Sequence, residues 1–176
     1  MSDDVKLCVE ILEKAIAFER EGIRFFRDKA ENAPNEMERM IFRSLAKDEA
    51  GHEAHLRKLL DDLLATNQLE GLQPEGHEHQ GPREIFESAL ALVETVSGAD
   101  DAELEILKGA MDVERRGHTM YAGAADSVIS PEAKALFEHL AAEEQNHYLL
   151  LNNTYTYLTN PSGWNAFDES PMLDGG

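Results

Sequence analysis

The stretch LAKDEAGH at residues 45–52 returns 95 residues later as LAAEEQNH at residues 140–147. Each copy contains Glu-x-x-His, formed by Glu49 and His52 in the first and by Glu144 and His147 in the second. In both copies the Glu and the His continue a run of large apolar residues spaced three and four apart, which is the period of one helix face. The pattern therefore predicts two helices that each turn a glutamate and a histidine toward a core.

The repeat extends upstream to a second pair of glutamates, Glu19 and Glu114. Glu19 precedes Glu49 by 30 residues, and Glu114 precedes Glu144 by the same interval. Both also lie on apolar helical stripes, where charged residues are unusual. The midpoints of the two intervals fall at positions 34 and 129, in predicted turns. In an antiparallel hairpin the glutamates of each pair therefore lie at one height, and the chain is expected to contain two copies of one helical hairpin.

Helical periodicity covers four long segments, at about residues 3–33, 36–66, 100–128 and 131–159. Short links at 33–35 and 129–130 make the helices of each hairpin antiparallel neighbours. A longer crossover at about 67–99 contains an apolar patch over 85–96, which we interpret as a short extra helix. We expect an all-α antiparallel four-helix bundle over residues 1–160. A C-terminal tail, 161–176, would follow, and either its Trp164 docks on the bundle or on another subunit, or the tail is partly mobile.

The composition excludes several classes of protein. Acidic residues number 35 against 16 basic ones, a formal charge of −19, which opposes binding to nucleic acid or to an anionic membrane. Cys8 is the only cysteine, so neither an intramolecular disulfide nor a Cys-x-x-Cys metal knuckle can form. The N-terminal residues lack the pattern of a signal peptide, and no apolar stretch is long enough to span a membrane. These features favour a cytoplasmic location.

Four carboxylates that converge in an apolar core would repel one another, and burial of an unpaired carboxylate is costly. Two divalent metal ions resolve the conflict, since they balance four glutamates while two neutral imidazoles complete the ligand set. We therefore predict a two-metal site with these ligands: Glu19, Glu49, His52, Glu114, Glu144 and His147. Carboxylate and imidazole suit iron or manganese, with zinc possible. The ligand count leaves positions open for dioxygen, peroxide or water.

This pattern resembles the ferritin-like superfamily and, within it, the rubrerythrin-type di-iron proteins. AIAFEREGIRFF at residues 15–26 is similar to that family's first helix, and residues 45–52 are similar to its second. The likeness covers residues 5 to about 160. It implies a ferritin-like bundle, the same six ligands and a cofactor of two iron ions.

The sequence departs from the family pattern in two places. Typical rubrerythrins carry a rubredoxin domain with four iron-binding cysteines, which we expect this chain to lack. They also have a second glutamate three residues after the third-helix ligand, linked in the family to an iron that moves during redox cycling. Here that position is Gly117, so the site would have six protein ligands and be more similar to ferritin or bacterioferritin.

The sequence offers further candidate residues besides the six ligands. Family members often have tyrosines seven or eight residues after the glutamates of the first and third helices. Tyr121 fits this rule and would hydrogen-bond a ligand carboxylate, whereas Phe26 at the matching place cannot. Gly22 and Gly117 each follow a ligand glutamate by three residues, for close helix packing or, alternatively, to leave space for a small oxidant. His77 and His79 fit a solvated loop better than a metal site.

Three functions remain open. The leading one is a non-haem di-iron oxidoreductase that reacts with peroxide or dioxygen, in oxidative stress or iron handling, and is re-reduced by an external electron donor. The second is a ferritin-like ferroxidase or iron-storage protein. The third is a non-catalytic metal-binding helical module. In each of the first two, a homo-oligomer, a dimer or larger, is expected.

Overall fold

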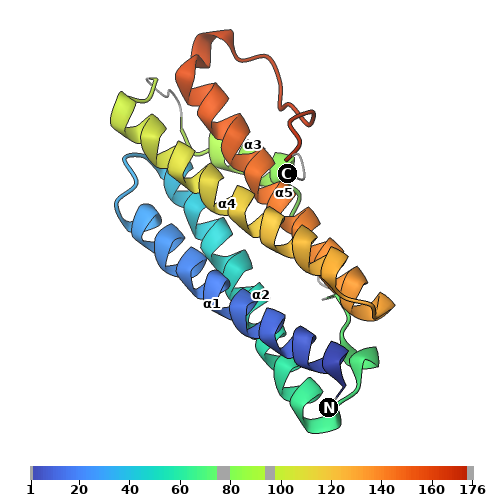
Figure 1. Ribbon diagram of the computed structural model, residues 1–176. Coiled ribbons are helices and arrows are strands. Elements are labelled where there is room, and N and C mark those ends of the chain that lie inside the picture. Colours follow the sequence, from blue (N-terminus) through green and yellow to red (C-terminus); the bar gives the residue numbers. More distant parts are fainter. Residues whose placement is uncertain (1, 75–79, 94–97, 174–176) are drawn as a thin grey trace.

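The computed structural model describes residues 2–74, 80–93 and 98–173, and within these ranges every regular element is a helix. The two predicted hairpins are formed by α1 (Asp3–Glu31) with α2 (Glu36–Thr66) and by α4 (Asp101–Ser127) with α5 (Pro131–Thr159). In Figure 1 the four long helices run alongside one another as a bundle. The all-α bundle expected from the sequence is confirmed.

Side chains at the helix ends set these boundaries. Asn35 accepts a hydrogen bond from the backbone N–H of Glu38 at the start of α2, and Ser130 caps α5 in the same way ahead of Pro131. A capping box formed by Asp100 and Glu103 starts α4. The two hairpin turns therefore lie close to the midpoints that the repeat predicted.

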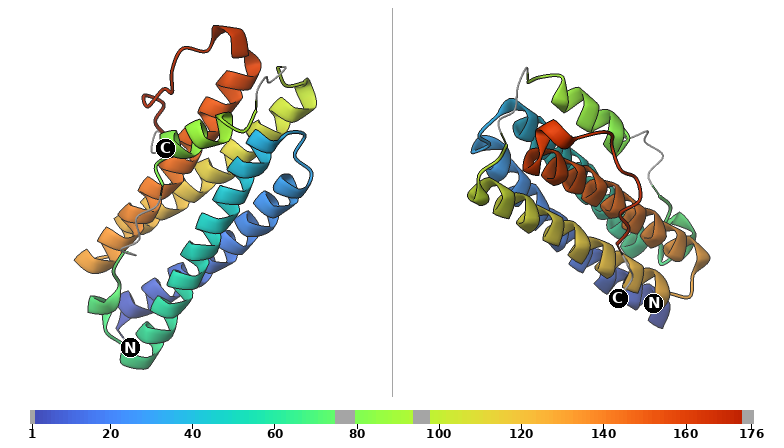
Figure 2. Two further views of the ribbon diagram at one scale, coloured as in Figure 1. Left: turned by 180° about the vertical axis from the view of Figure 1, so that it is seen from behind. Right: turned by 90° about the horizontal axis from the view of Figure 1, so that it is seen from above.

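The crossover carries a short helix, α3 (Pro82–Leu90), as well as a 3-10 turn at Leu69–Gly71. The expected helix covered 85–96, so the observed one begins earlier, because Pro82 occupies the first helical turn where its missing N–H costs nothing. Residues 94–97, in the second half of that expectation, lie outside the described ranges. Figure 2 shows α3 lying across the face formed by α2 and α5, against which it packs.

The apolar core is divided into two clusters along the bundle axis. One contains Phe26, Phe42 and Leu151, toward the turn between α1 and α2. The other contains Leu12 and Phe137, together with further leucines of α2 and α5, toward the turn between α4 and α5. The glutamates and histidines of the repeat lie in sequence between these clusters on every long helix. The polar residues are therefore enclosed at mid-height by apolar layers.

The C-terminal segment folds back on the bundle after α5 (Figure 1). The Trp164 ring lies 5.2 Å from the Phe86 ring of α3 and 5.7 Å from the Tyr157 ring of α5, measured between centroids. Further along, the Asn153 side chain hydrogen-bonds the backbone of Asp168 in both directions. Of the two docking alternatives, Trp164 thus takes the one within its own chain. No helix in the described ranges is long and apolar enough to cross a membrane.

Glu38 is a buried carboxylate outside the mid-height cluster, with 2% of its surface exposed. Its carboxylate accepts a hydrogen bond from Asn35 Nδ2 at 2.7 Å. Burial, followed by the charge of Glu103, raises the pKa of Glu38 to about 7. In the unfolded chain the group titrates near pH 4.5, so folding takes up a proton between these two values.

We predict that Glu38→Gln makes the protein more stable at pH 8 and changes its stability little at pH 4. The raised pKa of Glu38 costs the native state free energy that sets in as the pH rises from about 4.5 to 7, and glutamine escapes this cost. The expected gain at pH 8 is about 1–3 kcal/mol. Urea unfolding of the metal-free proteins across this pH range measures it. A difference between the two proteins that does not change with pH would contradict the burial of an ionisable Glu38.

Candidate metal centre

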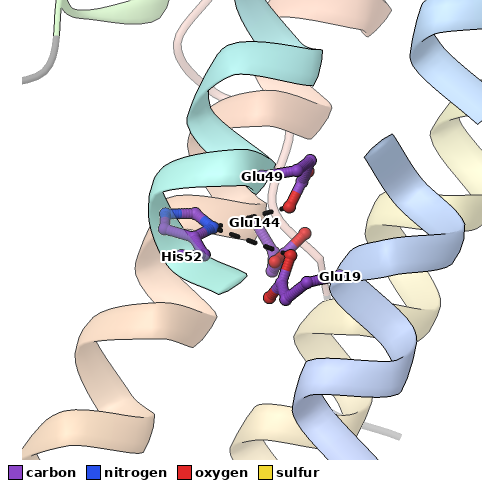
Figure 3. Close-up of side chains that lie close together, drawn as sticks. All are labelled: Glu19, Glu49, His52 and Glu144. Carbon is purple, nitrogen blue, oxygen red and sulfur yellow. Dashed lines mark ion pairs between the residues drawn. The ribbon is translucent and has the colours of Figure 1, made fainter. Parts of the chain in front are cut away.

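The six residues expected as ligands come from all four long helices and meet in the core. α1 supplies Glu19, α4 supplies Glu114, and α2 and α5 each supply a glutamate and a histidine. Each of the six side chains belongs to a residue that is at most 5% exposed. Figure 3 shows Glu19, Glu49, His52 and Glu144 pointing toward one another from α1, α2 and α5. The structure therefore brings together every residue of the predicted ligand set.

The cluster consists of two overlapping groups of potential ligands. The first is Glu19, Glu49, His52 and Glu144, and the second is Glu49, Glu114, Glu144 and His147. Within each group, one ligand atom from each residue lies within 4.8 Å of all the others. Glu49 and Glu144 belong to both groups, whereas one further glutamate and one histidine belong to each group alone.

Both histidines direct Nδ1 toward the carboxylates. His52 Nδ1 lies 3.5 Å from Glu49 Oε2 and 3.9 Å from Glu19 Oε2. His147 Nδ1 lies 3.3 Å from Glu49 Oε1 and 3.6 Å from Glu114 Oε2. The two imidazole rings are stacked with their centroids 5.8 Å apart. Nδ1 is thus the nitrogen that each ring offers to the centre of the cluster.

The electrostatics of the cluster favour a bound cation. Burial raises the pKa of Glu19 and of Glu144 well above the ordinary value, and the nearby charge of Glu49 raises both further. In the described part of the chain, neither oxygen of Glu114 and neither oxygen of Glu144 has a hydrogen-bond partner. Buried polar atoms without partners are rare in native proteins, and they are explained when an ion takes the missing place. The oxygen and nitrogen donors present fit a pair of divalent metal ions.

Tyr121 contacts the cluster as the family resemblance implied. It is fully buried on α4, and its hydroxyl donates a hydrogen bond to Glu19 Oε1. Phe26, 95 residues earlier, packs on the Phe42 ring instead, with a centroid separation of 6.4 Å. Glu19 therefore has a tyrosine as its hydrogen-bond donor. The equivalent of Tyr121 in the repeat, Phe26, has no hydroxyl to offer to Glu114, the equivalent of Glu19.

Sequence reasoning missed one residue at the cluster, Asp48. Its Oδ2 lies 3.7 Å from Nε2 of His147, on the side of the ring that faces away from the glutamates. The two residues also line a pocket of about 110 Å³ between α2, α5 and the start of α3. A carboxylate in this position favours a proton on Nε2, which leaves Nδ1 free to bind a metal. The one signal in the sequence was that Asp48 and Glu143, its equivalent in the repeat, are both acidic.

Among the histidines that the structure describes, only His52 and His147 belong to the two ligand groups. His55 Nε2 is hydrogen-bonded to the backbone oxygen of Gln73 at 2.8 Å. His77 and His79, considered above as loop residues, lie outside the described ranges.

Comparison with known proteins gives a family. The rubrerythrin family model matches residues 10–155, which span all four long helices. A solved structure of a hypothetical protein from Pyrococcus furiosus is similar, with a TM-score of 0.64 and 27% sequence identity, over 89% of this chain and 93% of that one. No curated protein matches the chain. With a family match over most of its length and a ferritin-like bundle that holds a buried carboxylate and histidine cluster, the chain belongs to the rubrerythrin family of ferritin-like di-iron proteins.

Proposed function

We propose that this protein is a di-iron oxidoreductase that reacts with peroxide or dioxygen. The observation that supports this is the pair of overlapping ligand groups that share Glu49 and Glu144 in a buried core. Glu19 and His52 would complete one iron position, and Glu114 and His147 the other. When bound, the two ions would supply the electrons that reduce the oxidant, and an external donor would restore them. Manganese or zinc are alternatives that the same donor atoms accept.

The protein's own part is to hold the ligands and to limit access. Tyr121 holds the carboxylate of Glu19 through its hydrogen bond, and the carboxylate of Asp48, 3.7 Å from Nε2 of His147, favours the tautomer of that ring with a proton on Nε2. The two apolar clusters enclose the site from both ends of the bundle. This enclosure would keep water and competing reactants away from bound ions.

A second candidate is a ferroxidase or iron-storage protein. Gly117 in place of a seventh carboxylate and the formal charge of −19 favour it. Storage needs a large hollow assembly, whereas a peroxide-reducing enzyme can work as a dimer, so light scattering separates the two.

A non-catalytic metal-binding module is the third candidate, and it would show no reaction with either oxidant. We further propose a cytoplasmic location, since Cys8 is a buried free thiol.

The proposed function is tested by loading the protein with Fe(II) without oxygen and then adding peroxide or dioxygen. We expect two ions per chain and an absorbance change that is faster with peroxide. Glu49→Ala and Glu144→Ala should abolish binding of the pair, because each variant removes a ligand from both groups. Their helicity should remain, since truncation also removes a buried charge.

Glu138→Ala is the matched control, because Glu138 is on α5 but pairs with Lys134 at the surface. It should bind two ions as the wild type does. Iron that fails to bind to the wild type, or two ions retained in either ligand variant, would reject the proposed site.

Tyr121→Phe tests the hydrogen bond to Glu19. Loss of a donor to a ligand carboxylate is expected to weaken metal binding by roughly tenfold and to lower the stability of the metal-free protein by about 1–3 kcal/mol. Calorimetric metal titration and urea unfolding measure the two effects. Tyr155→Phe is the control, because it removes a hydroxyl from a tyrosine of α5 that lies away from the ligands. The ring of Tyr155 packs under the ammonium group of Lys108, a residue of α4. Equal metal affinities in the two variants would show that Tyr121 does not support the site.

Asp48→Ala tests the contact with His147 Nε2. Without the carboxylate the imidazole loses the group that favours its metal-binding tautomer, and metal affinity should fall by about tenfold or more. Asp48→Asn should lose less, because an amide oxygen still accepts a hydrogen bond from Nε2. Asp62→Ala, an exposed position on the same helix, should have no effect. If Asp48→Ala binds metal as tightly as the Asp62 control, Asp48 has no part in orienting His147.

A further inference from the structure

Gly117 lies on α4, buried, one turn after Glu114. A Cβ atom built on it would lie 2.8 Å from both Cδ and Oε2 of Glu144 and 2.9 Å from Cε1 of Phe18. These distances are shorter than any normal van der Waals contact. The carboxylate of Glu144 and the ring of Phe18 thus fill the place where a side chain at position 117 would begin. Close packing, rather than space left for an oxidant, is what this glycine provides.

The repeat supplies a direct comparison in Gly22, which occupies the equivalent position on α1. A Cβ atom there would lie 3.5 Å from Cγ and 3.6 Å from Cδ of Glu49, which are ordinary contact distances. Glu49 and Glu144 correspond in the repeat and belong to both ligand groups. Glu144, however, lies so close to α4 that the residue facing it, Gly117, can carry no side chain. Glu49 leaves room for a Cβ atom at Gly22.

The surroundings of Glu144 decide what a side chain at position 117 would change. Glu144 is 0% exposed, so its carboxylate has packed neighbours rather than water to move into. The Phe18 ring is itself covered by the guanidinium of Arg116, which lies 5.9 Å from the ring centroid. The end of a glutamate side chain rotates more easily than a helix backbone shifts. An added methyl group would therefore displace the carboxylate first, and the helices little.

We propose that Gly117 is a positioning residue for Glu144: its missing side chain lets this carboxylate take the bridging place between the two metal positions. The inference rests on the proposed two-metal site and adds a requirement to it. It also fits the six-ligand set, because any side chain at position 117 would begin where the Glu144 carboxylate and the Phe18 ring now lie. Gly117 on α4 thus determines where the carboxylate of Glu144, a ligand from α5, lies relative to the metal positions.

Co(II) titration of the metal-free protein tests the proposal, with the visible spectrum of bound Co(II) as a second reading of ligand geometry. The wild type and Gly22→Ala should each bind two ions with similar affinities and spectra. Gly117→Ala should bind at least one ion roughly tenfold or more weakly, with an altered spectrum. The thermal unfolding midpoint of the metal-free Gly117→Ala protein should change little, because the displaced group is a side-chain end.

The double variant Phe18→Ala/Gly117→Ala separates the two contacts and also serves if Gly117→Ala alone fails to fold. It relieves the contact with the ring and keeps the contact with Glu144, so binding should stay weak relative to Phe18→Ala. Recovery to the affinity of Phe18→Ala would overturn the proposal, because it would assign the effect to helix packing. If Gly117→Ala binds Co(II) as tightly as the wild type, the proposed role of Gly117 is overturned, while the proposed two-metal site still stands. If the wild type binds no Co(II) or Fe(II), the proposed site itself is rejected, and this inference with it.

Discussion

Repulsion among four buried carboxylates is the constraint on which the rest of this structure depends. Glu19, Glu49, Glu114 and Glu144 approach closely where water cannot screen them. In the metal-free protein, burial and the neighbouring charge of Glu49 raise the pKa values of Glu19 and Glu144 well above the ordinary value. Bound divalent cations would remove the repulsion and would be ligated by the oxygens that otherwise lack partners. A cation bound at this site would therefore offset the cost of burying the four carboxylates.

The fold meets this constraint by repeating one hairpin. Each hairpin places a glutamate of one helix level with the Glu-x-x-His of the next, and packing two hairpins together brings the sets into contact. Apolar clusters on both sides hold the four helices at the spacing that the ligands need. The crossover and the C-terminal segment then cover α2 and α5 on the outside, through α3 and the aromatic contacts of Trp164.

The two halves of the site differ although they come from a repeat. Glu19 has a tyrosine donor, whereas the residue that corresponds to Tyr121 in the other hairpin is Phe26. Glu144 lies against a glycine that it requires, whereas Glu49 leaves room at Gly22. Two ions bound here would therefore have different surroundings. Such inequality suits a site whose ions take different parts in a reaction, and it arises from residues that bind no metal themselves.

The sequence alone determined the four helices, their pairing and the six residues that converge, because helical period and the 95-residue repeat are properties of residue order. Only the tertiary structure decided how closely the side chains of neighbouring helices approach, within a hairpin as well as between hairpins, since this depends on how two helix faces meet. The approach of Asp48 to His147 and the lack of room at Gly117 are of this kind. In the sequence Gly22 and Gly117 look alike. They differ because Phe18 and Glu144 reach one of them from other helices, and no local pattern records that distance.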